Sequence, residues 1–382
     1  MVRAATLFSF NMKWSIHFVT IAGTQVRVHI TFFLLLAFIW FSTRSAHGQE
    51  AALWTTVFVL ALFLCVLLHE FGHVFAARRY GIRTPEITLL PIGGVAHLER
   101  MPRRPAHELV VAIAGPLVNV AIAGLLFLFL RTQPPLGIEE ALAITSPTSF
   151  LMALMVVNLW LVVFNMIPAF PMDGGRVLRA LLAIRLDYGR ATAIAATIGQ
   201  ALALVGGLIG FMYFHPLLIL VAIFIFLGAG QEASAARLQA ATNGLPVSNA
   251  MMTRFRTLHR GHTLGDAIDF LLQGSQSDFP VVDETGHLRG MLMRADLVSA
   301  LAEHGRGHPV TDVMVDCPAD QVITPELGLT RALEILHASP CNSVPVLTED
   351  DRRLVGLLTR ENIGEMIMIN SALNRYRRHQ AE

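Results

Sequence analysis

Residues 54–77 form an almost uninterrupted apolar run, and this run contains the sequence His69-Glu70-Phe71-Gly72-His73. An apolar stretch of about 20 residues is long enough to cross a membrane as a helix. Ionisable groups inside such a helix are costly and are usually functional. His69 and His73 are four residues apart, so on a helix their imidazoles leave the same face one turn apart. Two histidines placed in this way can occupy two corners of a zinc tetrahedron.

Glu70 lies between the two histidines and needs a reason to be in an apolar helix. A carboxylate beside a bound metal can accept a proton from a water that the metal has made more acidic, and can later give it to a leaving amine. A single histidine on an apolar helix is more often a packed side chain than a ligand, but the pair with Glu70 favours a zinc site. The motif therefore indicates zinc-dependent hydrolysis, with a peptide bond as the expected substrate.

Composition bounds the class of protein. Apolar residues make up 54% and charged residues only 15% of the 382 positions, which indicates an integral membrane protein. The net charge of +1 gives no global basic field, so nucleic acid is not an expected partner. Cys65, Cys317 and Cys341 lie far apart with no paired spacing, so they supply no zinc ribbon and fit a reducing compartment or a membrane. The first residues lack a small-residue cleavage site, so no removable signal peptide is expected.

The apolar runs predict six membrane spans. Before the first one, residues 14–29 alternate with a period of two around a glycine, which predicts a short β-hairpin. Arginines gather in the connections after the second and fourth spans, whereas the other connections carry few, and positive residues favour the cytoplasmic side. We therefore expect a multi-pass protein of the inner (cytoplasmic) membrane with both termini in the cytoplasm. The expected spans are residues 30–41 with their flanks, 54–77, 109–130, 150–167, 191–214 and 217–230.

A zinc ion held by two histidines needs a third protein ligand and keeps a fourth position for water. Asp173 is the best candidate, because it follows the fourth span in a segment with two prolines and two glycines. These residues break the helix and expose backbone at membrane depth, which is tolerated only where protein or a water-filled cavity supplies partners. The alternative is that Asp173 only caps the helix that begins near Gly174.

Three asparagines lie within the apolar runs: Asn119, Asn158 and Asn165. An amide can donate to the oxyanion that develops on a cleaved carbonyl, or it can join one helix to another. We interpret Asn165, which is nearest to the helix break, as catalytic, and the other two as structural. Residues 91–95 contain a glycine turn that could pair with an unfolded substrate segment through backbone hydrogen bonds, although an ordinary connection is the alternative.

These motifs together resemble the site-2 protease family of zinc intramembrane metalloproteases, over about residues 14–230. The motifs that carry the resemblance are His69-Glu70-x-x-His73, Asn165-x-x-Pro168-x-x-Pro171-x-Asp173-Gly174, Gly93-Gly94 and Gly115-Pro116-x-x-Asn119. The resemblance implies cleavage of membrane-embedded protein substrates, with His69, His73 and Asp173 as ligands of one catalytic zinc ion and Glu70 as the base.

The C-terminal part contains an internal repeat with a period of a little over sixty residues. Each unit reads as strand, helix, strand, strand, helix, and the pair resembles tandem CBS domains. That family implies an adenosine-nucleotide sensor that tends to form dimers. Its ribose-phosphate signature is Thr or Ser followed three residues later by Asp. The first repeat offers Met293 and Asp296 and the second offers Thr359 and Asn362, so neither signature is intact. The matching segments are 247–251 with 310–314, 279–282 with 344–347, and 290–294 with 356–360.

A hydroxyl and an amide can still hold a ribose, so an adenine nucleotide at Thr359 and Asn362 is one expectation, and a purely structural or dimerising pair is the other. The predicted fold is a polytopic α-helical membrane protein of about six transmembrane helices with a C-terminal soluble α/β tandem CBS module. The predicted function is intramembrane zinc proteolysis modulated by the CBS pair, and a CBS-regulated metal or ion transporter is the alternative. The expected segments are a transmembrane domain (1–235), a linker (236–246), two CBS domains (247–305 and 306–370) and a basic tail (371–382).

Overall fold

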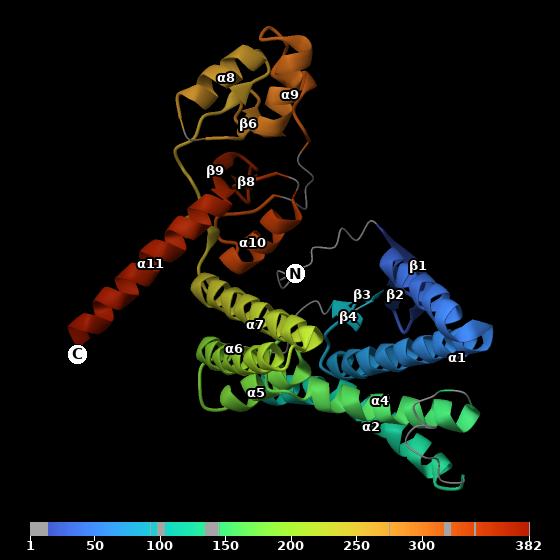
Figure 1. Ribbon diagram of the computed structural model, residues 1–382. Helices are drawn as coiled ribbons and strands as arrows, with labels where there is room; N and C mark the ends of the chain where they lie inside the picture. The colour runs from blue at the N-terminus through green and yellow to red at the C-terminus, as the bar shows by residue number, and fades with distance from the viewer. Residues whose placement is uncertain are drawn as a thin grey trace. The chain divides into compact units, whose positions relative to one another are not determined.

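The computed structural model describes residues 14–91, 93–97, 104–133, 144, 146–274, 276–316, 322–339 and 341–381. It divides the chain into two compact units, Met1–Ala236 and Arg237–Glu382. The first unit is built from apolar helices and one small sheet, and the second is an α/β unit (Figure 1). The expected fold class, a helical membrane protein with a C-terminal α/β module, is therefore confirmed.

Five of the described helices are long and apolar enough to cross a membrane. The longest, α1, is broken at Gly48, where φ is 88°, a backbone conformation that glycine adopts without strain. Figure 1 shows α1 as two helical segments that meet at an angle, so this one helix contains both the first and the second expected span. The five helices are α1 (Ile30–Arg79), α2 (Pro105–Leu130), α4 (Pro147–Asn165), α6 (Tyr188–Met212) and α7 (Pro216–Thr242).

A four-stranded sheet packs against α1 next to the histidine motif. Its strands follow the order β1-β2-β3-β4, with β2 and β3 parallel and the two outer pairs antiparallel. The predicted hairpin is the β1–β2 pair, and the glycine turn leads from β3 into β4. Val26 and Ile87 of the sheet pack with Phe71 and Val74 of α1, so the core of the sheet touches the turn that carries the metal motif. The strands are β1 (Ser15–Ile21), β2 (Thr24–His29), β3 (Glu86–Leu90) and β4 (Gly93–His97).

Close packing of α1 on α2 depends on a residue with no side chain. A Cβ atom added at Gly72 would lie 2.7 Å from the backbone oxygen of Ala114 and 2.9 Å from Cγ2 of Val118. Small residues allow membrane helices to approach closely, where packing and interhelical hydrogen bonds hold them together. Gly72 therefore lets the turn between His69 and His73 approach the backbone of α2.

The second unit contains the predicted repeat. The first repeat has a strand, a helix, two paired strands and a second helix, and in the second repeat the first strand is reduced to a bridge between Ile323 and Val346. The elements of the first repeat are η2 (Val247–Asn249), β5 (Leu258–His259), α8 (Leu264–Leu272), β6 (Phe279–Val282), β7 (Leu288–Leu292) and α9 (Arg294–His304). Those of the second are η3 (Val310–Asp312), α10 (Leu329–Ala338), β8 (Ser343–Leu347), β9 (Leu354–Thr359) and α11 (Arg360–Ala381).

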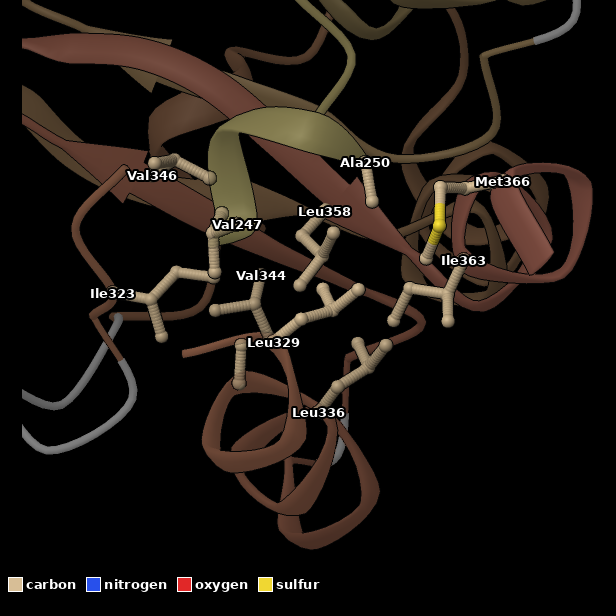
Figure 2. Close-up of a cluster of buried hydrophobic side chains, with 11 residues drawn as sticks. Val247, Ala250, Ile323, Leu329, Leu336, Val344, Val346, Leu358, Ile363 and Met366 are labelled. Atoms are coloured by element: carbon tan, nitrogen blue, oxygen red, sulfur yellow. The ribbon is translucent and has the colours of Figure 1, made fainter. Parts of the chain in front are cut away.

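Each repeat starts with a segment that packs into the core of the other repeat. Val247, at the start of the first repeat, lies in one buried cluster with Val344 and Leu358 of the second (Figure 2). Val310, at the start of the second repeat, lies in the core of the first with Leu258 and Phe279. The two repeats therefore exchange their first segments.

Two of the expected segment boundaries fall inside helices. Residues 236–242 of the expected linker are the end of α7, and only the residues after Thr242 lead out of it. The expected tail is also helical, because α11 runs from Arg360 to Ala381 without a break. The first residues of the expected linker and most of the expected basic tail are therefore helical, and the division into domains stays a prediction.

Candidate metal centre

His69, His73 and Asp173 meet at a buried point between α1 and α5 (Asp173–Leu182). The Nε2 atoms of the two histidines are 3.1 Å apart, and Oδ2 of Asp173 is 3.2 Å from the first and 3.1 Å from the second. The three atoms form a nearly equilateral triangle. In the described part of the chain these three residues are the one group of His, Cys, Asp and Glu side chains that could hold a metal ion.

The size of this triangle fits a zinc ion. Zinc binds imidazole nitrogen and carboxylate oxygen at about 2.0–2.2 Å in a tetrahedron, so adjacent ligand atoms are separated by about 3.3 Å. The observed separations of 3.1–3.2 Å are close to that value. Two nitrogens and one carboxylate oxygen are also a donor set that catalytic zinc sites use, with the fourth position left for water.

The orientation of His73 is set by a backbone carbonyl. Its Nδ1 atom lies 2.7 Å from the oxygen of Val111 in α2, and a carbonyl oxygen can only accept a hydrogen bond. Nδ1 must therefore carry the proton, and in the neutral ring Nε2 presents a lone pair to the centre. Hydrogen bonds of this kind at the far nitrogen orient metal-binding histidines and raise their basicity.

His69 is oriented by a relay of two asparagines. The Nδ2 atom of Asn158 donates to the carbonyl of Leu154 over 2.8 Å, which leaves its Oδ1 to accept from Nδ2 of Asn119, also over 2.8 Å. The Oδ1 atom of Asn119 in turn lies 2.5 Å from Nδ1 of His69. Because the relay begins at a carbonyl that can only accept, it places the proton of His69 on Nδ1 and its lone pair on Nε2.

Two lone pairs and a carboxylate oxygen thus converge at a point that water barely reaches. His69, His73 and Asp173 are each no more than 6% exposed. Electron-rich atoms repel one another at such distances, and the repulsion is strong where the surroundings are apolar. A cation between the three atoms removes this repulsion, so the residues present fit a divalent metal.

Gly115 leaves room for the two imidazoles. A Cβ atom added there would collide with the ring of His73 and would lie 2.7 Å from Nε2 of His69. Pro116 follows inside α2. A glycine is therefore required at the position where the backbone of α2 passes beneath the converging rings.

Asp173 is the first residue of α5, and Met172 occupies the N-cap position. Its Oδ2 atom faces the two histidines, while its Oδ1 atom lies 3.7 Å from the guanidinium of Arg176. A Cβ atom added at Gly174 would collide with the backbone of Met166 and Ile167, so the chain before α5 folds back tightly. This arrangement favours a ligand role for Asp173 over the alternative of a simple helix cap.

Glu70 lies against the edge strand β4. A Cβ atom added at Gly94 would be 2.8 Å from Cγ of Glu70 and 3.3 Å from Cγ1 of Val66. The strand can approach Glu70 this closely because Gly94 has no side chain. The edge of the sheet therefore lies directly beside the glutamate of the histidine motif.

The structure separates the roles of the three asparagines. Asn119 and Asn158 join α2 to α4 and also orient His69, a contact that the sequence interpretation of a purely structural role missed. Asn165 donates to the carbonyl of Leu161 in its own helix over 3.0 Å, so its catalytic role stays a prediction. The contact of Asn119 with His69 could have been suspected from the sequence, because Asn119 is an amide in an apolar helix close to Gly115. The contact of His73 with Val111 could not, because every residue has a backbone carbonyl.

In the second unit, Thr359 and Asn362 bond to each other. The hydroxyl of Thr359 donates to Oδ1 of Asn362 over 2.7 Å and accepts from the backbone nitrogen of Asn362 over 3.1 Å. Asn362 lines a depression of about 350 Å³, together with Asn249, Glu365 and Asn370. The two residues lie side by side, as the signature requires, and one of them borders a concave surface.

Known proteins match both units. The sequence model of peptidase family M50 matches residues 57–144 and 133–206, and that of the CBS domain matches residues 247–303 and 310–368. The chain is 36% identical over 281 residues to zinc metalloprotease MJ0392 of Methanocaldococcus jannaschii, a match that covers 74% of this chain and 78% of that protein. It is 28% identical over 368 residues to Rip3 of Mycobacterium tuberculosis, and this match covers 91% of each chain. The solved site-2 protease from Methanocaldococcus jannaschii is 38% identical, with a TM-score of 0.44 over 58% of this chain and 95% of that chain.

Replacing Asn119→Ala should lower the affinity for zinc by about 10- to 100-fold, because His69 loses the partner that orients its ring. Asn165→Ala is the matched control: it removes an amide from the same region that contacts only its own helix among the contacts described, and it should leave zinc affinity unchanged. Competition with a chromophoric chelator measures both affinities. Equal zinc affinities in the two variants would contradict the role given to Asn119.

Proposed function

Because this chain belongs to the site-2 protease family of zinc metalloproteases, peptidase family M50, and carries a CBS pair, we propose that His69, His73 and Asp173 bind its catalytic zinc and that Glu70 is its general base. One observation carries the assignment of ligands: three donor atoms from two distant segments of the chain meet within 3.1–3.2 Å. The sequence motif alone could supply only two of them.

The reaction that these residues perform is hydrolysis of a peptide bond. A zinc ion in the site would supply the Lewis acidity that makes a water more acidic and polarises the scissile carbonyl. Glu70 accepts the proton of the attacking water as its oxygen bonds to the carbonyl carbon. Glu70 then gives this proton to the amide nitrogen as the C–N bond breaks, which leaves a carboxylic acid and an amine. His69 and His73 keep their Nδ1 protons throughout, because Asn119 and Val111 hold them.

We propose membrane-embedded protein segments as the substrate class. The motif lies within an apolar helix, so a segment that already lies in the bilayer can reach it. A substrate helix must unwind before cleavage, because its carbonyls are hydrogen-bonded and shielded by the following turn.

The edge strand β4 offers an unwound substrate a partner. Among the described strands β4 pairs only with β3, and its Gly94 touches Glu70. A substrate segment that added to this edge would replace its lost helical hydrogen bonds with strand hydrogen bonds. Its backbone would then pass directly beside the proposed base.

Backbone N-methylation of a substrate peptide near its cleavage point should therefore slow cleavage by about tenfold or more, because each methyl group removes a donor from strand pairing. Peptides methylated one residue at a time distinguish the positions that pair with β4 from those that face away. A peptide methylated far from the cleavage point is the control. Cleavage that is indifferent to methylation at every position would contradict strand addition.

We further propose that both termini lie in the cytoplasm, in an inner membrane. Arginines support this orientation, because Arg78 and Arg79 end α1 and the exposed Arg185 and Arg190 lie after α5 and at the start of α6. Positive residues near the ends of spans favour the cytoplasmic side. This orientation exposes the CBS pair to cellular nucleotides.

Glu70→Gln should abolish peptide cleavage while the protein keeps one bound zinc per chain, because Gln cannot accept a proton but leaves the three ligands in place. Metal analysis and cleavage of a membrane-embedded substrate in vesicles measure the two properties on the same preparation. The competing function, a CBS-regulated metal or ion transporter, predicts zinc flux into vesicles that survives Glu70→Gln. Such flux without cleavage in the wild type would overturn the proposal.

We propose that the CBS pair binds an adenine nucleotide near Thr359 and Asn362 and thereby modulates cleavage. The family supplies the ligand class, and the depression beside Asn362 supplies a surface with several amide groups. Dimerisation through this unit stays a prediction.

The full-length protein should release or absorb heat on titration with AMP or ATP, and Asn362→Ala should weaken binding by about tenfold, the loss of one hydrogen bond to the ligand. Asp296→Ala changes the corresponding position of the first repeat and should leave the affinity unchanged. A cleavage assay with and without nucleotide gives the sign of the effect. Absence of heat with both nucleotides would remove this proposal and leave the protease assignment intact.

A further inference from the structure

Arg179 is a fully buried arginine in α5, less than two turns after Asp173. It is 1% exposed, and so is Glu108 of α2. The Nε atom of Arg179 donates to Oε1 of Glu108 over 2.7 Å, and its NH2 group lies 2.5 Å from the same oxygen. A buried ion pair of this kind is stabilised only while both partners are present, since either charge alone would be left uncompensated.

A second carboxylate and two aromatic rings also contact the guanidinium of Arg179. Its NH1 group donates to Oε1 of Glu232 in α7 over 2.5 Å. The Cζ atom of Arg179 lies 5.0 Å from the centre of the Phe170 ring and 4.9 Å from that of the Tyr188 ring, within the range of cation–π attraction. Arg179 therefore ties α5 to α2, α6, α7 and the segment before α5.

The contact of Arg179 with α2 differs from its other contacts, because α2 also carries the residues that contact the two histidines. Glu108, Val111, Gly115 and Asn119 are spaced by three, four and four residues, so they form one buried stripe along α2. Val111 accepts from His73, Gly115 leaves room for both imidazoles, and Asn119 accepts from His69. Glu108 is the residue of this stripe that holds α5, the helix that begins with Asp173.

We propose that the Glu108–Arg179 ion pair is a positioning element of the metal centre, which sets the distance of Asp173 from the two histidines. One stripe of α2 then aligns all three ligands: two through hydrogen bonds to the imidazoles and the third through a charge pair that fixes α5. The proposal rests on the assignment of His69, His73 and Asp173 as zinc ligands.

Glu232 allows a matched comparison, because it is the second carboxylate on the same arginine. Its side chain is 28% exposed, and it belongs to α7, which contributes none of the ligands or their hydrogen-bond partners described above. If Arg179 only stabilised the fold, loss of either carboxylate would act through stability alone. If the Glu108–Arg179 pair positions Asp173, the loss of Glu108 should lower the affinity for zinc, and the loss of Glu232 should leave that affinity unchanged.

The test compares Glu108→Gln with Glu232→Gln in the full-length protein in detergent. Both changes keep the side-chain volume and one acceptor, and in each variant Arg179 keeps the other carboxylate as its charged partner. Glu108→Gln should weaken zinc binding by about tenfold, the lower end of the effect of losing an outer partner of a ligand. It should also change the visible absorption of the cobalt-substituted protein, which reports the symmetry of the ligand set. Glu232→Gln should leave both the affinity and the spectrum as in the wild type.

Thermal unfolding of the metal-free proteins separates stability from metal binding. Wild-type zinc affinity and an unchanged cobalt spectrum in Glu108→Gln would overturn the positioning role, and so would equal losses of affinity in the two variants. Failure of the wild-type protein to bind zinc would instead refute the proposed function. The two failures are therefore distinguishable.

Discussion

The first unit depends on the cost of placing polar groups in apolar surroundings. His69, His73 and Asp173 present two lone pairs and a carboxylate oxygen to one another, and the Asn158–Asn119 relay and the carbonyl of Val111 fix the lone pairs there. Each of these groups would be unfavourable alone in such an environment, and each is satisfied by the next. The chain of partners ends at a position that a cation fits.

The same requirement explains the glycines around the site. Gly72 lets α1 approach α2, Gly115 makes room for the imidazoles, and Gly94 lets β4 reach Glu70. At all three positions a methyl group would separate elements that must lie close together for the polar contacts to form. Close approach of the backbones at these positions therefore lets the polar contacts of the site form, as small residues do for helices packed in lipid.

Much of this site could be predicted from the sequence, because the His-Glu-x-x-His spacing and an aspartate at a break in an apolar segment are local patterns with few structural explanations. The helical membrane fold and the repeat in the second unit were also predictable, from long apolar runs and from repeated segments. The break of α1 at Gly48 and the helical state of residues 236–242 could not be predicted. Both depend on where a helix ends, and the local sequence there is compatible with more than one end point. The partners of the histidines were missed because the carbonyl of Val111 carries no residue signature, and Asn119 meets His69 only after the helices pack.

The exchange of first segments between the two CBS repeats couples their unfolding. Val247 fills a space among side chains of the second repeat, and Val310 fills the equivalent space in the first. Neither half can loosen without withdrawing a buried side chain from its neighbour, so the halves are interlocked and lose their order together. Whatever stabilises one half therefore protects the other from unfolding, even if it touches only one of them.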